Sequence, residues 1–177
     1  DGYYQWDKEQ SCVNIWKKYF VQQWMNNRLN PDRDKAAFVD AVNYKLHEFS
    51  LPINPSSCSV DNVVKELSVD FRDDEATLLI SFMDGAVKPF DTLPAGYERL
   101  YSIVLDLASR SYLLNKNTDP EGIVLIDEID LHLHPSLEAE VLPRLQRSFP
   151  HIQFIVSTHS PIVISNFDQN DGRPDDY

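Results

Sequence analysis

Residues 123–135 read IVLIDEIDLHLHP, and residues 152–161 read IQFIVSTHSP. Each stretch begins with an apolar, largely β-branched run of the kind that lies buried on both faces of a parallel sheet. Between them, a helical pattern of apolar residues opens at Pro135 and continues to Leu145. A strand, a helix and a strand joined by short loops predict a right-handed βαβ unit, and therefore an α/β fold built on a parallel sheet.

Both predicted strands run directly into polar side chains. The first strand is followed by Asp127 and Glu128, and the second by Ser157, Thr158 and His159. Ligands of an open parallel sheet bind beyond the carboxyl ends of its strands, so we expect these side chains to line one crevice. That crevice would hold two carboxylates, two hydroxyls and an imidazole.

The two carboxylates are suited to different chemical tasks. Four apolar residues followed by Asp-Glu match the Walker B pattern. Asp127, at the end of the strand, is placed to hold Mg²⁺ through a water, because Mg²⁺ keeps most of its hydration shell. Glu128 would orient and deprotonate an attacking water. Taken alone, the pair is equally compatible with a strand that ends at a solvated loop.

The continuation of both stretches narrows the interpretation. LIDEIDLHLHP (125–135) and STHSP (157–161) resemble the ABC-type ATPases of the RecF, SMC and OLD group. The resemblance implies the C-terminal half of a parallel-sheet P-loop NTPase, with ATP and Mg²⁺ as cofactors. It places Asp130 in the D-loop, which crosses the interface of an ATP-sandwiched homodimer or higher homo-oligomer. It makes His159 the switch histidine that senses the γ-phosphate.

A third segment, LPAGYER (93–99), lies where the family places its signature motif ahead of a long helix. The resemblance implies nucleotide contacts from Leu93, Ala95, Gly96 and Tyr97, because a helix N-terminus offers free N–H groups to a phosphate of the opposite subunit. A proline at position 94 and Ala95 depart from the family's serine and glycine. The same letters resemble a bacterial subgroup that includes the ATPase of the Septu anti-phage system. An ordinary helix-initiating turn is the alternative.

The phosphate-binding loop itself is absent from the sequence. None of the five glycines begins or completes a Gly-x-x-x-x-Gly-Lys-Ser/Thr pattern. The backbone cradle for the α- and β-phosphates, and the lysine for the γ-phosphate, must then come from elsewhere. The chain is therefore expected to be either a piece of a longer ATPase, which we favour, or a natural remnant of one.

The N-terminal third has a different pattern. Residues 1–50 are expected to form a helical subdomain or insert, with aromatic side chains recurring near a period of 3.6. These aromatics predict a core face, or a docking surface for a partner. Residues 51–65, rich in proline and serine, are expected to be a linker. The ATPase part, 66–177, would begin with a β-hairpin whose strands include Leu67 and residues 77–82.

Composition limits the remaining possibilities. The 177 residues carry 28 acidic and 16 basic side chains, a net charge of -12, and no basic face is evident, so the surface as a whole is expected to repel polyphosphate backbones. The sequence does not decide whether the protein binds nucleic acid. Cys12 and Cys58 have no metal-binding spacing and indicate reduced thiols in a cytoplasmic protein. No stretch is long and apolar enough for a membrane span.

Two further functions compete with ATP hydrolysis by the head. His132 and His134, beside Asp127, superficially offer ligands to a metal-dependent hydrolase, although histidines that pack and hydrogen-bond along the loop are the simpler interpretation. The chain could also serve as a nucleotide-gated interaction module. In a defence system its partner would be a nuclease.

Overall fold

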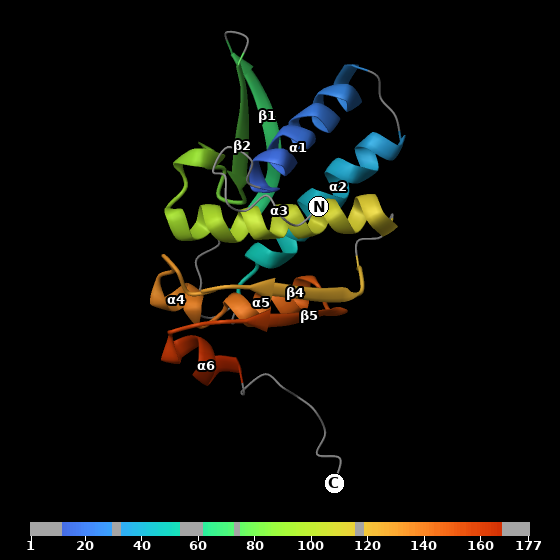
Figure 1. Cartoon of the computed structure of the whole chain (residues 1–177). Helices are drawn as coiled ribbons and strands as arrows, with labels where there is room; N and C mark the ends of the chain where they lie inside the picture. The colour runs from blue at the N-terminus through green and yellow to red at the C-terminus, as the bar shows by residue number, and fades with distance from the viewer. Residues whose placement is uncertain (1–11, 30–32, 54–61, 73–74, 116–118, 168–177) are drawn as a thin grey trace.

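The first half of the protein is a helical layer packed on a β-hairpin. The computed structural model describes residues 12–29, 33–53, 62–72, 75–115 and 119–167 (Figure 1). Helices α1 (Cys12–Leu29) and α2 (Arg33–Ser50) are helical as predicted, and the rest of the predicted range 1–50, residues 1–11 and 30–32, lies outside the described part of the chain. The long helix α3 (Ala95–Asn115) packs against both of them and separates this half from the second one.

The predicted hairpin is present and gains a third strand. Strands β1 (Val64–Arg72) and β2 (Glu75–Phe82) pair antiparallel, and β3 (Val87–Pro89) pairs with the other side of β2. Gly85, at φ +91°, forms the turn that returns the chain to β2, a conformation that glycine adopts without strain. A short 3₁₀ turn, η5 (Phe90–Thr92), then leads into α3.

The expected linker is shorter than predicted at its C-terminal end. Strand β1 begins at Val64, so residues 64 and 65 belong to the sheet and not to a connection 51–65. Val64 is fully buried and pairs with Phe82, and a register irregularity between Val64 and Glu66 precedes the regular alternation of β1. Residues 54–61, with Cys58, lie outside the described part of the chain.

The predicted βαβ unit forms the second half. Strands β4 (Gly122–Ile126) and β5 (Ile152–Val156) pair parallel, in register from Gly122 opposite Ile152. The connecting helix is divided into α4 (Pro135–Glu138) and α5 (Val141–Ser148), and α6 (Pro161–Phe167) follows β5. Pro143 accounts for the division, because it has no N–H to donate to the carbonyl of Ala139 and its ring would crowd that carbonyl.

One apolar core joins the two halves. Buried side chains from α1, α2, α3, β1, β2 and α5 form a single cluster. The aromatic residues of α1 belong to it: Phe20 is fully buried, and Trp16, Tyr19 and Trp24 pack against it half-buried. This confirms the core face and leaves the alternative, a docking surface on α1, without support.

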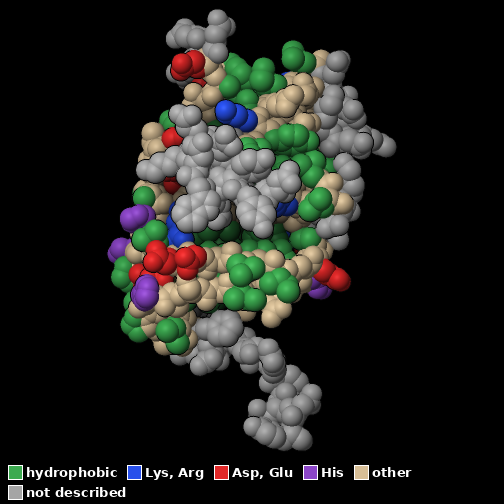
Figure 2. Space-filling view, in the orientation of Figure 1, with side chains coloured by type: hydrophobic (Ala, Val, Ile, Leu, Met, Phe, Trp, Pro, Cys, Tyr) green, Lys and Arg blue, Asp and Glu red, His purple; other side chains and the backbone are tan. Residues whose placement is uncertain are grey.

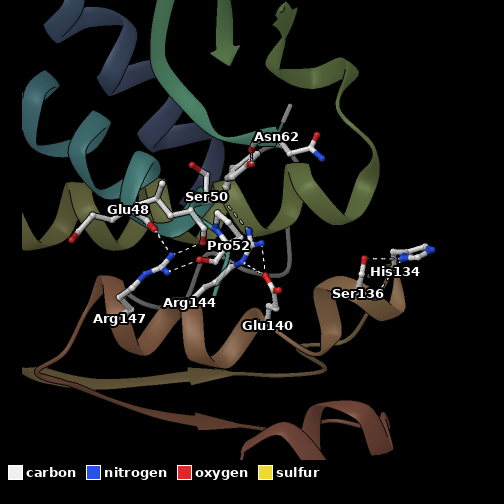
Figure 3. Close-up of polar contacts among 11 residues, drawn as sticks. Glu48, Ser50, Pro52, Asn62, His134, Ser136, Glu140, Arg144 and Arg147 are labelled. Carbon is white, nitrogen blue, oxygen red and sulfur yellow. Dashed lines mark hydrogen bonds and ion pairs between the residues drawn. The ribbon is translucent and has the colours of Figure 1, made fainter. Parts of the chain in front are cut away.

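Arginines of α5 fasten that helix to the end of α2 (Figure 3). Arg147 donates to the backbone carbonyls of Glu48, Leu51 and Pro52, at 2.6, 2.5 and 3.2 Å. The last carbonyls of a helix lack intrahelical partners, and these bonds supply some. In return, Lys45 of α2 donates to the carbonyl of Ser148 at the end of α5, at 2.5 Å.

One face of the β4–β5 pair is open, which differs from the prediction of strands buried on both faces. The side chains of Ile123, Leu125 and Ile155 are 62%, 76% and 50% exposed. Figure 2 shows hydrophobic side chains at the surface over β4. Among the described residues, no helix or strand covers these three side chains, so the apolar run is buried on one face alone. None of the described helices is both long and apolar enough to cross a membrane.

Candidate active site

The carboxyl ends of β4 and β5 bring the predicted polar residues together. Sheet pairing continues past the strands, since Ser157 N–H donates to the carbonyl of Ile126 and Ile129 N–H donates to that of Ser157, both at 3.0 Å. The Ser157 hydroxyl donates to the Asp127 carboxylate and accepts from Glu128 N–H at 2.8 Å. Acidic and histidine side chains gather at this end of the strands (Figure 2).

The loop that follows β4, residues 127–133, turns sharply twice. Glu128 and His132 adopt left-handed backbone angles, φ +49° and +63°, which cost non-glycine residues roughly 1 kcal/mol each. Two turn bonds of 3.0 Å hold the loop, from Leu131 N–H to the carbonyl of Glu128 and from Leu133 N–H to that of Asp130. Strained backbone held by its surroundings is typical of functional loops.

The Glu128 carboxylate is available for chemistry. The residue is exposed, and within the described part of the chain its carboxylate accepts no hydrogen bond. Asp127, also exposed, has one carboxylate oxygen engaged by the Ser157 hydroxyl. The two adjacent carboxylates therefore have different surroundings, as two separate tasks would require.

Asp130 ties the first loop to the second. One of its oxygens accepts from the Thr158 hydroxyl at 2.5 Å and from His159 N–H at 3.2 Å. The pKa of the Asp130 carboxyl is lowered, and the hydrogen bond from Thr158 is the largest cause. Asp130 is accordingly ionised at neutral pH and fixes the backbone that carries His159.

The segment of His159 is also anchored on its far side. Ser160 N–H donates to the Thr158 hydroxyl at 3.0 Å, and the Ser160 hydroxyl donates to Glu138 of α4. The same hydroxyl accepts from Ile162 N–H at 3.2 Å, so Ser160 caps α6. His159 itself is exposed, on a backbone held from both directions.

The signature segment lies against the loop of the same chain. Helix α3 begins at Ala95, which is exposed, whereas Leu93 is buried in the core and Tyr97 is half-buried beside Tyr101. Gly96 is buried, and a Cβ placed there would lie 2.6 Å from the carbonyl oxygen of His132. The glycine thus permits contact between α3 and the 127–133 loop. Nucleotide contacts from this segment stay a prediction.

Arg99 is the functional residue that sequence reasoning missed. Its guanidinium donates to the carbonyls of Asp127 at 2.8 Å, Glu128 at 2.6 Å and Leu131 at 3.1 Å. Burial lowers the pKa of the guanidinium, although nearby carboxylates oppose the shift. A basic residue one turn into a helix beside an acidic loop was the available signal.

One of the two loop histidines has a structural explanation. His134 caps α4: its Nδ1 lies 2.9 Å from the Ser136 hydroxyl and accepts from Ser136 N–H at 3.3 Å, with Pro135 in the first helical position (Figure 3). His132 is exposed. Across the ranges the structure describes, no three His, Cys, Asp or Glu side chains are grouped to hold a metal ion.

We expect the purified chain to hold no stoichiometric zinc at His132 and His134. The Nδ1 of His134 is already used in the cap, and a tight site needs three or four converging ligands. Elemental analysis by inductively coupled plasma mass spectrometry measures the metal content after dialysis. About one zinc per chain, lost in a His132→Ala variant, would contradict this expectation.

The polar residues at the ends of β4 and β5 form a candidate site at the edge of the sheet where parallel α/β folds bind ligands, and comparison with known proteins gives the family. The family described as "AAA domain, putative AbiEii toxin, Type IV TA system" matches residues 26–165. The chain belongs to this family of ATPase domains. The α/β fold is shared with an SMC ATPase described under "Structural biochemistry of ATP-driven dimerization and DNA stimulated activation of SMC ATPases", with a TM-score of 0.51, 16% identity, and coverage of 87% of this chain and 77% of the other.

Two relatives illustrate the sequence similarity. The chain is 50% identical over 80 residues to the Retron Ec83 probable ATPase of Escherichia coli, covering 43% of this chain and 15% of that protein. It is 32% identical over 144 residues to the Septu protein PtuA of Bacillus mycoides (strain KBAB4), covering 79% of this chain and 19% of the relative. The chain thus spans less than a fifth of the length of either relative. The resemblance to a Septu-related ATPase is confirmed, and the metal-dependent hydrolase is not favoured.

Proposed function

We propose that this chain forms the Walker B, D-loop, switch and signature part of an ATP-hydrolysing head. One observation carries the proposal: Asp127, Glu128, Asp130 and the residues around His159 meet at the ends of two adjacent parallel strands, joined by hydrogen bonds. Ligand sites of parallel α/β sheets lie at this position. The family supports ATP as the ligand.

The donor atoms at the strand ends fit Mg²⁺. The cation prefers oxygen ligands and keeps several waters, and Asp127 offers an exposed carboxylate whose orientation the Ser157 hydroxyl fixes. When bound with ATP, Mg²⁺ neutralises developing charge on the phosphates. Asp127 would hold it through a water, at the rigid end of β4.

The remaining residues would act around the γ-phosphate. Glu128, with its free carboxylate, would orient the attacking water and take its proton. His159 would contact the γ-phosphate from the segment that Asp130 holds. The N-terminus of α3, with Leu93, Ala95, Gly96 and Tyr97, would face a nucleotide held by a second copy, so that the active unit is a homodimer or a higher homo-oligomer.

The exposed apolar face of the β4–β5 pair supports the proposal that further secondary-structure elements cover this sheet in the complete protein. Three exposed aliphatic side chains on a two-stranded parallel sheet favour burial against further elements, since each fully buried one is worth about 1.5–3 kcal/mol. We propose that a strand and helix bearing a phosphate-binding loop lie on this sheet in the complete protein.

The chain by itself, without a phosphate-binding loop, is expected to bind Mg²⁺-ATP weakly and to show no turnover. Positioning and charge neutralisation of the phosphates make up most of the catalysis of phosphoryl transfer. Calorimetric titration with ATP and a phosphate-release assay measure the two quantities. A Mg²⁺-dependent rate of ATP hydrolysis by the chain alone, lost in an Asp127→Ala variant, would contradict the expectation that turnover requires a phosphate-binding loop.

The names of the relatives support a biological setting. A retron ATPase and a Septu protein are both similar to this chain. We propose that the complete protein works in antiviral defence, in the cytoplasm, where ATP-driven closure of paired heads controls an effector such as a nuclease. Co-purification of the complete protein with its genomic neighbours, in ATP and in its absence, tests this.

A further inference from the structure

We infer that Arg99 is a positioning residue that joins the first turn of α3 to the Walker B turn, so that the signature segment and the Glu128 backbone move as one body. The inference rests on the proposed function, because it assigns Arg99 a part in ATP turnover. Arg99 has no expected contact with nucleotide, and it acts through the loop that carries Glu128.

The hydrogen bonds of Arg99 cover the turn where the catalytic carboxylates are set. Three carbonyls, those of Asp127, Glu128 and Leu131, converge on one guanidinium within 3.1 Å. The planar fork of arginine presents several donors in fixed directions, which a flexible lysine ammonium cannot reproduce. Glu128 is held at φ +49°, a strained value that persists only where surrounding contacts fix it, and the bond from Arg99 to its carbonyl is one of these contacts.

Gly96 supplies a second contact on the same side of the helix. Residues three positions apart lie on one helical face, so Gly96 and Arg99 both point to the loop. Gly96 abuts the carbonyl of His132, next to Leu131, while Arg99 also bonds the carbonyls of Asp127 and Glu128 at the start of the loop. With two contacts, α3 cannot pivot about a single point against the loop.

The guanidinium of Arg99 does not occupy the carboxylate oxygens of the neighbouring loop. Asp127, Glu128 and Asp130 all act electrostatically on Arg99, yet its hydrogen bonds within the described residues go to backbone carbonyls. The guanidinium therefore offsets the acidic loop without occupying the oxygens needed for a metal or a water. A salt bridge to Glu128 would have blocked the proposed base.

The test compares two arginines that make the same number of carbonyl bonds. Arg99→Lys keeps the charge and removes the fork, and Arg147→Lys does the same at the α2–α5 joint, away from the site. In the complete protein, we expect Arg99→Lys to lower kcat by about 10-fold to 10²-fold, since small misplacements of reacting groups have such effects. ATP affinity should change little, because the clamp touches no nucleotide. Arg147→Lys should leave kcat near the wild-type value.

Hydrogen exchange gives a readout that does not depend on activity. Arg99→Lys is expected to speed exchange of the Leu131 and Leu133 amides, whose bonds close the loop turns, and Arg147→Lys is not. Unchanged kcat in Arg99→Lys, beside a wild type that hydrolyses ATP, would overturn this inference alone. Equal losses of kcat and of thermal stability in both variants would overturn it as well. A wild type without hydrolysis, and with no effect of Glu128→Gln, would overturn the proposed function itself.

Discussion

Glu128→Gln in the complete protein is expected to lower ATP hydrolysis by about 10²-fold to 10⁴-fold, the usual contribution of a positioned general base. Glutamine keeps the size of the side chain and can accept a hydrogen bond from water, but it cannot take the proton. The left-handed backbone at residue 128 should be unaffected, because its hydrogen bonds use the main chain. Mg²⁺-dependent phosphate release at saturating ATP measures the loss.

A matched control is available at the opposite end of β4. Glu121 is an exposed glutamate next to the start of β4, at the opposite end from Glu128. Glu121→Gln makes the same chemical change away from the strand-end site and should leave the rate unaltered. A loss of rate in the Glu121 variant comparable to that in the Glu128 variant would indicate a general effect of charge.

Gly96→Ala is expected to destabilise the fold by about 1–3 kcal/mol, the typical cost of overpacking. The new Cβ would lie 2.6 Å from a backbone oxygen of His132, and backbone cannot rotate aside as a side chain can. Either α3 or the 127–133 loop must shift, which should also slow ATP hydrolysis in the complete protein. Thermal or denaturant unfolding measures the first effect.

Gly122→Ala separates the packing effect from the general effect of replacing glycine. An added Cβ at Gly122 meets no atom within 4 Å. In a strand, alanine is favoured over glycine by roughly 0.5–1 kcal/mol, so this variant should be neutral or slightly stabilised. Equal unfolding midpoints for the two variants would show that the contact between Gly96 and His132 is not a packing constraint.

The sequence predicted the elements with strong local signals. Strands 123–126 and 152–156 are marked by continuous apolar runs, and the β4 and β5 of the structure match them within one residue. The hairpin was also predicted, because turn residues delimit it, whereas α3 begins at Ala95, inside the signature segment that was expected to precede the helix. Asp127, Glu128 and Ser157 were expected to meet, and their hydrogen bonds confirm that they do.

The features that were missed depend on tertiary contacts or on one overlooked residue. Strand β3 has three residues, too few to show a period, and exists because Gly85 returns the chain to β2. The break between α4 and α5 was predictable from Pro143. The sequence offered only a weak signal for Arg99, a basic residue one turn into a helix, because its three carbonyl partners are about thirty residues away in sequence.

The measurement that tests the central claim most directly is ATP affinity and single-turnover rate, determined together for Glu128→Gln and Asp127→Asn in the complete protein. We predict that Glu128→Gln binds Mg²⁺-ATP as the wild type does and fails to hydrolyse it, whereas Asp127→Asn loses affinity because the metal is held less well. Hydrolysis by Glu128→Gln near the wild-type rate, or affinity no better than that of Asp127→Asn, would contradict the roles assigned to the two carboxylates at the end of β4.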